Sequence, residues 1–114
     1  MAPNLYLVFS KRPEAISAAD YDAWYEKHAQ ENIESPGFTS ARRYEISQGN
    51  GPPMPFEHLS LYEYEGPMQQ WRTSLTSRIE SGDVQLPEWF PQIQFGSWDA
   101  KPVSGLLTPA RLAG

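Results

Sequence analysis

The sequence predicts an α+β fold in which two helices cover one face of a four-stranded antiparallel sheet. Three observations lead to this prediction. The chain of 114 residues has room for a single core. Four short segments have the apolar spacing of strands, and two longer segments have the apolar spacing of helices. These elements follow one another as strand, helix, strand, strand, helix, strand.

The first half of the chain contains one strand, helix, strand unit. Residues 5–9 form a short apolar run, which is typical of a strand buried on both faces. Ser17 has a suitable side chain to cap the following helix, which must end before Pro36. We therefore expect a helix from Ser17 to about residue 33 and a second strand over residues 38–46.

The second half repeats this unit after an irregular segment. Residues 47–55 are rich in glycine and proline, which excludes regular structure. This loop is a candidate lid over a neighbouring pocket, with a passive connection between the two strands as the alternative. A third strand is expected over residues 57–64. Pro67 opens the second helix, Gly82 ends it, and residues 93–99 form the fourth strand.

This element order is that of the ferredoxin-like sandwich. We assign residues 1–100 to one such domain and residues 101–114 to a C-terminal extension. Because both helices cover the same face of the sheet, the other face is left bare, and a second copy of the chain is the economical cover. We therefore expect a homodimer that closes into an α/β barrel, with the extension packed on the partner.

The composition excludes several classes of partner. The formal charge of −5, with only nine Lys and Arg, leaves no basic surface for nucleic acid. No apolar run approaches the ~20 residues of a membrane span. The chain has no cysteine, and its two histidines lie in different elements, so we expect neither a disulfide nor a metal site. We expect a cytoplasmic location.

The candidate site residues gather on one stripe of the first helix. Tyr21, Trp24, Tyr25, His28 and Asn32 lie at i, i+3, i+4, i+7 and i+11. A purely structural helix would more often use Leu, Ile and Val, so the stripe indicates a pocket wall for a small aromatic molecule. His28 is its only group that titrates near neutral pH. We predict that it is a general acid or base, with a structural hydrogen bond to a neighbouring strand as the alternative.

The strands are predicted to supply the opposite wall. Matching the aliphatic residues of the first and third strands places Tyr6, His58, Ser60 and Tyr62 on one semi-polar face. Strand alternation leaves open whether this face lies under the helices or in the dimer interface. Tyr62 is the predicted catalytic partner, which would hold a developing oxyanion. His58, at the start of its strand, is as readily explained by a structural role.

Further aromatic and basic residues are predicted to contact the substrate. They are Tyr6, Trp24, Tyr25, Arg42, Arg43, His58, Trp71 and Trp98. An arginine at position 42 or 43 would offer a planar fork to a carboxylate or phenolate. Strand alternation does not decide which of the two points inward, and both could instead lie at a solvated strand edge.

The first helix contains the motif W-Y-x-x-H. It is followed by P-G-F, A-R-R-Y, a later L-x-L-Y-E strand and a helix opened by G-P. This order of motifs resembles the dimeric α/β-barrel superfamily. Within it, the sequence is similar to EthD-like and muconolactone-isomerase-like proteins. The motif residues are Trp24, Tyr25, His28, Pro36, Gly37, Phe38, Arg42, Arg43 and Tyr44. The resemblance implies a ligand pocket between sheet and helices in each subunit. It does not choose the reaction, because the superfamily includes cofactor-free monooxygenases, isomerases, cyclases, dehydratases and haem-handling proteins.

These observations favour a small enzyme without a tightly bound cofactor. It would act on an oxygenated aromatic or cyclic molecule by histidine-assisted proton transfer, as a lyase, dehydratase or isomerase, with His28 and Tyr62 as its catalytic residues. Two alternatives remain open: a cofactor-free monooxygenase of the same fold, and a small-molecule-binding protein without chemistry. Oxygen consumption separates the first alternative from the leading hypothesis, and a histidine-dependent turnover separates the second.

Overall fold

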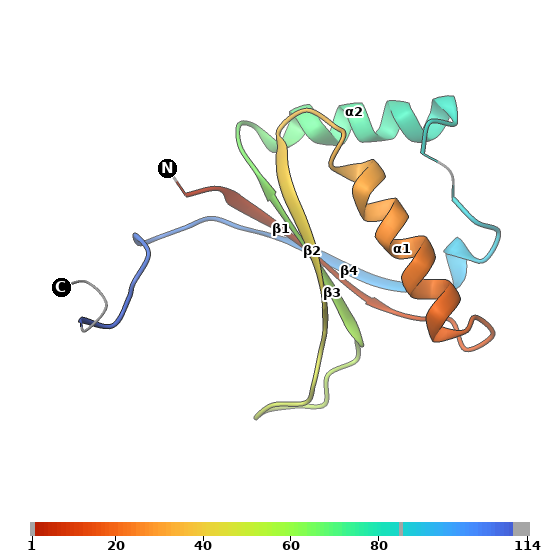
Figure 1. Ribbon diagram of the computed structural model, residues 1–114, viewed down its shortest axis with the longest axis horizontal. Coiled ribbons are helices and arrows are strands. Elements are labelled where there is room, and N and C mark those ends of the chain that lie inside the picture. The colour runs from red at the N-terminus through yellow and green to blue at the C-terminus, as the bar shows by residue number, and fades with distance from the viewer. Residues whose placement is uncertain (1, 85, 111–114) are drawn as a thin grey trace.

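The computed structural model describes residues 2–84 and 86–110. Within these residues the elements are β1 (Asn4–Lys11), α1 (Ala18–Asn32), β2 (Phe38–Glu45), β3 (His58–Tyr64), α2 (Met68–Ser81), a 3-10 turn (η1, Phe90–Gln92) and β4 (Gln94–Ala100). The strands form an antiparallel sheet in the order β2-β3-β1-β4. Both helices lie on the same face of that sheet (Figure 1). The predicted ferredoxin-like α+β fold is therefore confirmed.

Local interactions fix both ends of α1 and attach it to the sheet. The backbone N–H of Asp20 donates to Oγ of the capping residue Ser17 over 3.2 Å. The helix ends at Asn32, and Gly37 follows with a left-handed φ of 100° that turns the chain into β2. Between these ends, the Tyr21 hydroxyl donates to Oγ of Ser10 on β1 over 2.8 Å, in a fully buried position. The strong capping and this buried bond hold the helix at a fixed place over the sheet.

The register of the sheet decides which strand residues face the helices. Tyr6 of β1 lies opposite Tyr62 of β3, and Val8 lies opposite Ser60. Arg43 of β2 also lies opposite Ser60. Tyr62 and Ser60 are almost completely buried, and the Tyr62 hydroxyl accepts a hydrogen bond from α1. The semi-polar face expected from the sequence is therefore the helix-covered face, which answers the question that strand alternation left open.

The other face of the sheet is covered by nothing in the described chain. Leu7 pairs with Trp98 of β4, and the ring of Trp98 lies 5.5 Å from that of Phe9. Trp98 remains 55% exposed. A Cβ at Gly96 would lie 2.6 Å from the Trp98 ring, so the glycine leaves room for the ring to lie across the strand. The prediction that the first strand is buried on both faces is wrong for the single chain, because its outward side chains have no covering layer.

Residues 101–110, the described part of the C-terminal extension, run away from the sheet after β4 (Figure 1). Val103 is 100% exposed, and Leu106 and Leu107 are also exposed. The radius of gyration is 16.1 Å, above the ~13 Å typical of a compact chain of this length, in keeping with an arm that leaves the domain. The predicted contact between the extension and a partner subunit stays a prediction.

None of the helices in the described residues has the length and hydropathy that a membrane crossing requires.

Candidate functional site

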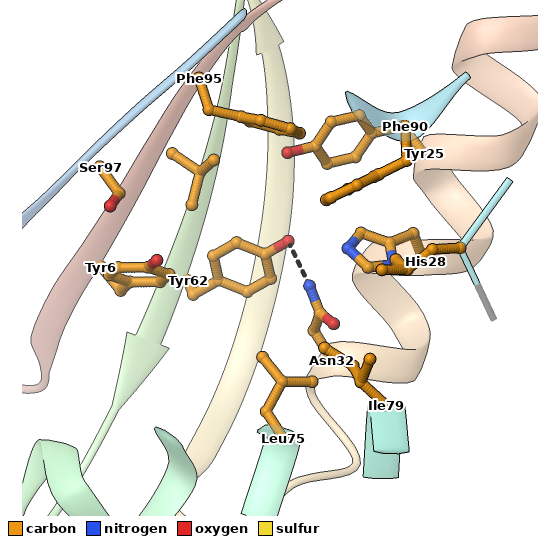
Figure 2. Close-up of a pocket in the computed structure, with 12 residues that line it drawn as sticks. Tyr6, Tyr25, His28, Asn32, Tyr62, Leu75, Ile79, Phe90, Phe95 and Ser97 are labelled. Atoms are coloured by element: carbon orange, nitrogen blue, oxygen red, sulfur yellow. Dashed lines mark hydrogen bonds between the residues drawn. The ribbon is translucent and has the colours of Figure 1, made fainter. Parts of the chain in front are cut away.

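A cavity of about 220 Å³ lies between the sheet and the helices (Figure 2). Its walls come from the sheet (Tyr6, Val8, Tyr62, Phe95, Ser97), from α1 (Tyr25, His28, Asn32), from α2 (Leu75, Ile79) and from the segment before β4 (Leu86, Phe90). Pockets for drug-sized ligands usually measure about 300–1,000 Å³, so this cavity suits a smaller molecule of about one or two fused rings. Most of its lining is aromatic or aliphatic, with a few polar groups.

His28 projects from α1 into this cavity. Its ring stacks on Trp24 with 4.8 Å between centroids and 15° between planes. The residue is only 9% exposed, and its Nδ1 has no hydrogen-bond partner among the described residues. Burial lowers the pKa of His28 from 6.5 to about 4. The imidazole is therefore neutral at physiological pH and can accept a proton.

Asn32 and Tyr62 form a polar pair beside His28. Asn32 lies one helical turn after His28, and its Nδ2 donates to the Tyr62 hydroxyl over 3.1 Å (Figure 2). Burial raises the pKa of Tyr62 to about 12, although the Asn32 donor favours the phenolate and opposes the rise. Tyr62 therefore keeps its proton at neutral pH. The Oδ1 atom of Asn32 is buried and lacks a partner in the described structure.

Tyr25 completes the polar part of the wall and is held from behind by a cation. The Arg43 guanidinium lies 4.8 Å from the centroid of the Tyr25 ring, a cation–π distance. The same guanidinium donates to Asp22 Oδ1 over 3.2 Å. Burial raises the pKa of Tyr25 above its ordinary value, so its phenol also stays protonated.

The structure brings together four of the residues that the sequence predicted for the site. Tyr6, Tyr25, His28 and Tyr62 all line the cavity. Trp24 does not line it but supports His28 by stacking.

Trp71 is fully buried with its ring 4.6 Å from that of Tyr6, so it too stands behind the lining. Trp98 lies elsewhere: β4 places it opposite Leu7 on the uncovered face, and the expectation that it closes this pocket is corrected.

The two arginines and His58 also lie outside the cavity. Arg43 faces the helices but packs behind Tyr25, whereas Arg42 lies opposite Leu61, whose side chain belongs to the other face. The expected arginine fork for a carboxylate is therefore absent from the cavity lining that the structure describes. His58 lies near Asp22, with 3.9 Å between Nε2 and Oδ1, toward the other end of α1.

The loop over residues 47–55 likewise supplies no lining residue among those described. The Gln48 side chain holds it together, accepting from the Met54 N–H over 3.0 Å and donating to the Pro52 carbonyl over 3.3 Å. It connects β2 to β3 outside the cavity lining, and its role as a lid stays a prediction.

Several lining residues were not predicted. Ser97 faces the cavity through the register of β4 against β1, which no pattern in the sequence gives, whereas Asn32 lies on the helix stripe already expected to form the pocket wall. Phe90 and Leu86 come from the irregular segment between α2 and β4, where no periodic pattern shows which side chains turn inward.

A protein-bound metal is not indicated by the residues that the structure describes, which contain no group of three or more His, Cys, Asp or Glu side chains placed to hold an ion. The cavity residues likewise form no cradle of backbone N–H groups at a helix N-terminus for a phosphate, since α1 faces the cavity with its middle and last turns.

Comparison with known proteins supports the fold and leaves the activity open. No protein-family model matches the sequence, and no curated protein matches it. Among solved structures, the chain is similar to the crystal structure of a "putative monooxygenase" from Shewanella loihica PV-4, with a TM-score of 0.61 and 9% sequence identity. The match covers 92% of this chain and 99% of that one. At this identity the likeness shows the shared ferredoxin-like α+β fold, a class of small proteins with two helices over one antiparallel sheet.

Proposed function

We propose that this protein is a small enzyme that needs no tightly bound cofactor and removes a proton from an oxygenated cyclic molecule. The observation that carries the proposal is the neutral, buried imidazole of His28 in the wall of a mainly apolar cavity, with no partner for its Nδ1 in the part of the chain that the structure describes. A general base must be unprotonated at working pH and within reach of the substrate. His28 meets the first condition through its burial and the second through its position in the lining.

The neighbouring phenols suit the other half of such a step. When a proton leaves a carbon beside a carbonyl group, the electron pair moves onto the carbonyl oxygen and makes an enolate. Tyr62 stays protonated because burial raises its pKa to about 12. Its oxygen accepts from Asn32, which leaves its own O–H free to donate to the enolate oxygen. A fixed donor of this kind stabilises the developing charge.

The low pKa of His28 is compatible with this role once the substrate is bound. Proton transfer produces an imidazolium and an enolate side by side, and opposite charges attract strongly in a cavity with little water. The face of Trp24, stacked 4.8 Å from the imidazole, also favours the positive charge. Both effects raise the basicity of His28 when the enolate forms, whereas the empty cavity keeps it neutral.

Two fates of the enolate define the candidate reactions. In the leading one, the enolate takes a proton back from His28 at another carbon, as in an isomerase, or expels a group from the adjacent carbon, as in a lyase or dehydratase. The second candidate is favoured by the description of the Shewanella protein. In that case the carbanion reacts with O₂, a CH₂ group becomes C=O, and the second oxygen atom leaves as water, with all the electrons supplied by the substrate.

We further propose that the functional unit is a homodimer of the dimeric α/β-barrel type, as the resemblance to EthD-like and muconolactone-isomerase-like proteins implies. The support is the uncovered sheet face, where Trp98 and Phe9 form an apolar surface. An exposed aromatic surface on a sheet favours association. The cavity lies on the opposite face of the sheet, so such a dimer would leave its lining intact.

Hydrogen exchange at carbon tests the proposal directly. β-Tetralone, a neutral bicyclic ketone, is incubated anaerobically with the protein in deuterium oxide, and the loss of its α-proton signals is followed by NMR. His28→Gln keeps the volume of the side chain but removes the base, and it is expected to slow the catalysed exchange about 10²-fold or more. His58→Gln, which changes the other histidine of the chain, is the matched control and should keep the wild-type rate.

The same experiment separates the alternatives. A wild-type exchange rate in His28→Gln would remove His28 as the base. Binding of the ketone without any catalysed exchange in the wild-type protein would support the binding module. Oxygen uptake on admission of air, with formation of the diketone, would select the monooxygenase.

A further inference from the structure

Among the described residues, two polar atoms in the cavity wall lack the partners that buried groups normally have. They are Oδ1 of Asn32 and Nδ1 of His28, on residues that are only 7% and 9% exposed. The other amide atom of Asn32 is already used, because Nδ2 donates to Tyr62. The free Oδ1 is therefore an acceptor that points to a missing donor.

This acceptor discriminates among ligands of the same shape. Within the described lining, Oδ1 is buried and unpaired. A ligand without an N–H or O–H group leaves this oxygen unpaired, whereas a ligand with a hydroxyl group supplies the missing hydrogen bond. The apolar part of the lining, which includes Leu75, Ile79 and Phe95, suits the ring system itself.

The charge of the lining discriminates as well. No charged side chain is among the described residues that line the cavity. The nearby Arg43 is directed to Asp22 and the outer side of the Tyr25 ring, and Arg42 belongs to the opposite face of the sheet. A carboxylate in the cavity would be buried without a counter-charge, which is strongly unfavourable.

We infer that the cavity selects uncharged ring compounds that carry a hydroxyl donor, such as phenols and enols, and rejects carboxylates of the same shape. The inference rests on the proposed function, because it takes the same cavity as the substrate site and names the class of ligand. It differs from the sequence-based expectation of an arginine that holds a carboxylate or phenolate, since the recognising group is now the Asn32 amide oxygen.

Calorimetric titration at neutral pH with four naphthalene derivatives tests this selection. β-Naphthol carries the donor, and β-methoxynaphthalene keeps the oxygen but has a methyl group in place of the donor hydrogen. Naphthalene lacks the oxygen and is smaller than both, and β-naphthoate carries the charge. The naphthol is expected to bind about tenfold or more tightly than the methoxy compound and naphthalene. It should bind about 100-fold or more tightly than the naphthoate.

Variants on α1 assign the selection to Asn32. Asn32→Leu removes the acceptor and should reduce the preference for naphthol over the methoxy compound to less than about threefold. Gln30→Leu, a matched change on the exposed side of the same helix, should leave the preference intact. The ligand series on the wild-type protein remains decisive if Asn32→Leu does not fold.

The outcomes separate this inference from the proposed function. Equal affinity for naphthol and methoxynaphthalene, tight binding of naphthoate, or no binding of naphthol would overturn the selection. Selective binding of naphthol, together with an absence of exchange in a ketone that calorimetry shows to occupy the cavity, would leave the selection standing and refute the enzyme. Catalysed ketone exchange without selective binding of naphthol would support the enzyme and refute the selection.

Discussion

The burial of His28 makes the stability of the protein depend on pH in a defined window. The pKa of His28 is lowered from 6.5 to about 4 in the folded chain, so the unfolded chain takes up a proton first as the pH falls. The stability contributed by the neutral imidazole is complete above pH 6.5 and is lost as the pH falls toward 4. Each pH unit between the two pKa values corresponds to about 1.4 kcal/mol, which gives a loss of about 3 kcal/mol.

This loss is large compared with the ~5–15 kcal/mol by which most domains are stable. It is measured by urea unfolding, followed by tryptophan fluorescence at fixed protein concentration, at several values from neutral pH down to about pH 4. Carboxylates also titrate in this range, so the quantity that reports on His28 is the difference between the wild-type protein and His28→Gln. The wild type should lose about 3 kcal/mol more than the variant.

The control for this measurement is His58→Gln, since it removes a histidine that lies outside the cavity. Its stability should fall with pH as steeply as that of the wild type. Parallel curves for the wild type and His28→Gln would show that the imidazole is already protonated, or solvated, in the folded protein. His28 would then be neither a neutral base at working pH nor the source of the loss of stability in acid.

Two other side chains give independent tests, one in the cavity and one on the uncovered face. Tyr62→Phe leaves the buried Nδ2 of Asn32 without its acceptor, so the free energy of unfolding should fall by about 1–3 kcal/mol and ketone exchange should slow; unchanged stability in urea would mean that the hydrogen bond is replaced by water. Trp98→Glu places a charge on the proposed interface and should convert the homodimer to monomers, as measured by sedimentation equilibrium. A wild-type protein that is already monomeric at micromolar concentration would contradict the proposed dimer.

The sequence predicted the fold and part of the candidate site because both depend on local periodicity. The helix stripe that carries Tyr25 and His28 follows from the 3.6-residue repeat, and the alternation of β1 and β3 brings Tyr6 and Tyr62 onto one face. The element order already placed the first and third strands side by side, and the hydrogen bond from Asn32 to Tyr62 in the structure shows that their shared face lies under α1.

The remaining site residues depend on features that have no periodic pattern. The register of β4, which turns Ser97 inward and Trp98 outward, is set after an irregular segment that follows α2. That segment also supplies Phe90 to the cavity. The direction of Arg43 depends on a distant ion pair with Asp22 on α1. Such pairings form only when the tertiary structure brings the elements together, so the residue types alone could not reveal them.

The placement of charge explains how one helix can serve both packing and chemistry. Asp22 pairs with Arg43 behind Tyr25, which keeps the charged groups out of the cavity and holds the aromatic wall in place. The side of α1 that bears His28 and Asn32 is consequently free of charged groups and mostly buried. The same burial that lowers the pKa of His28 weakens the fold in acid and keeps the imidazole ready to accept a proton at neutral pH. Any change that lets water or a cation reach His28 should therefore alter acid stability and proton transfer together.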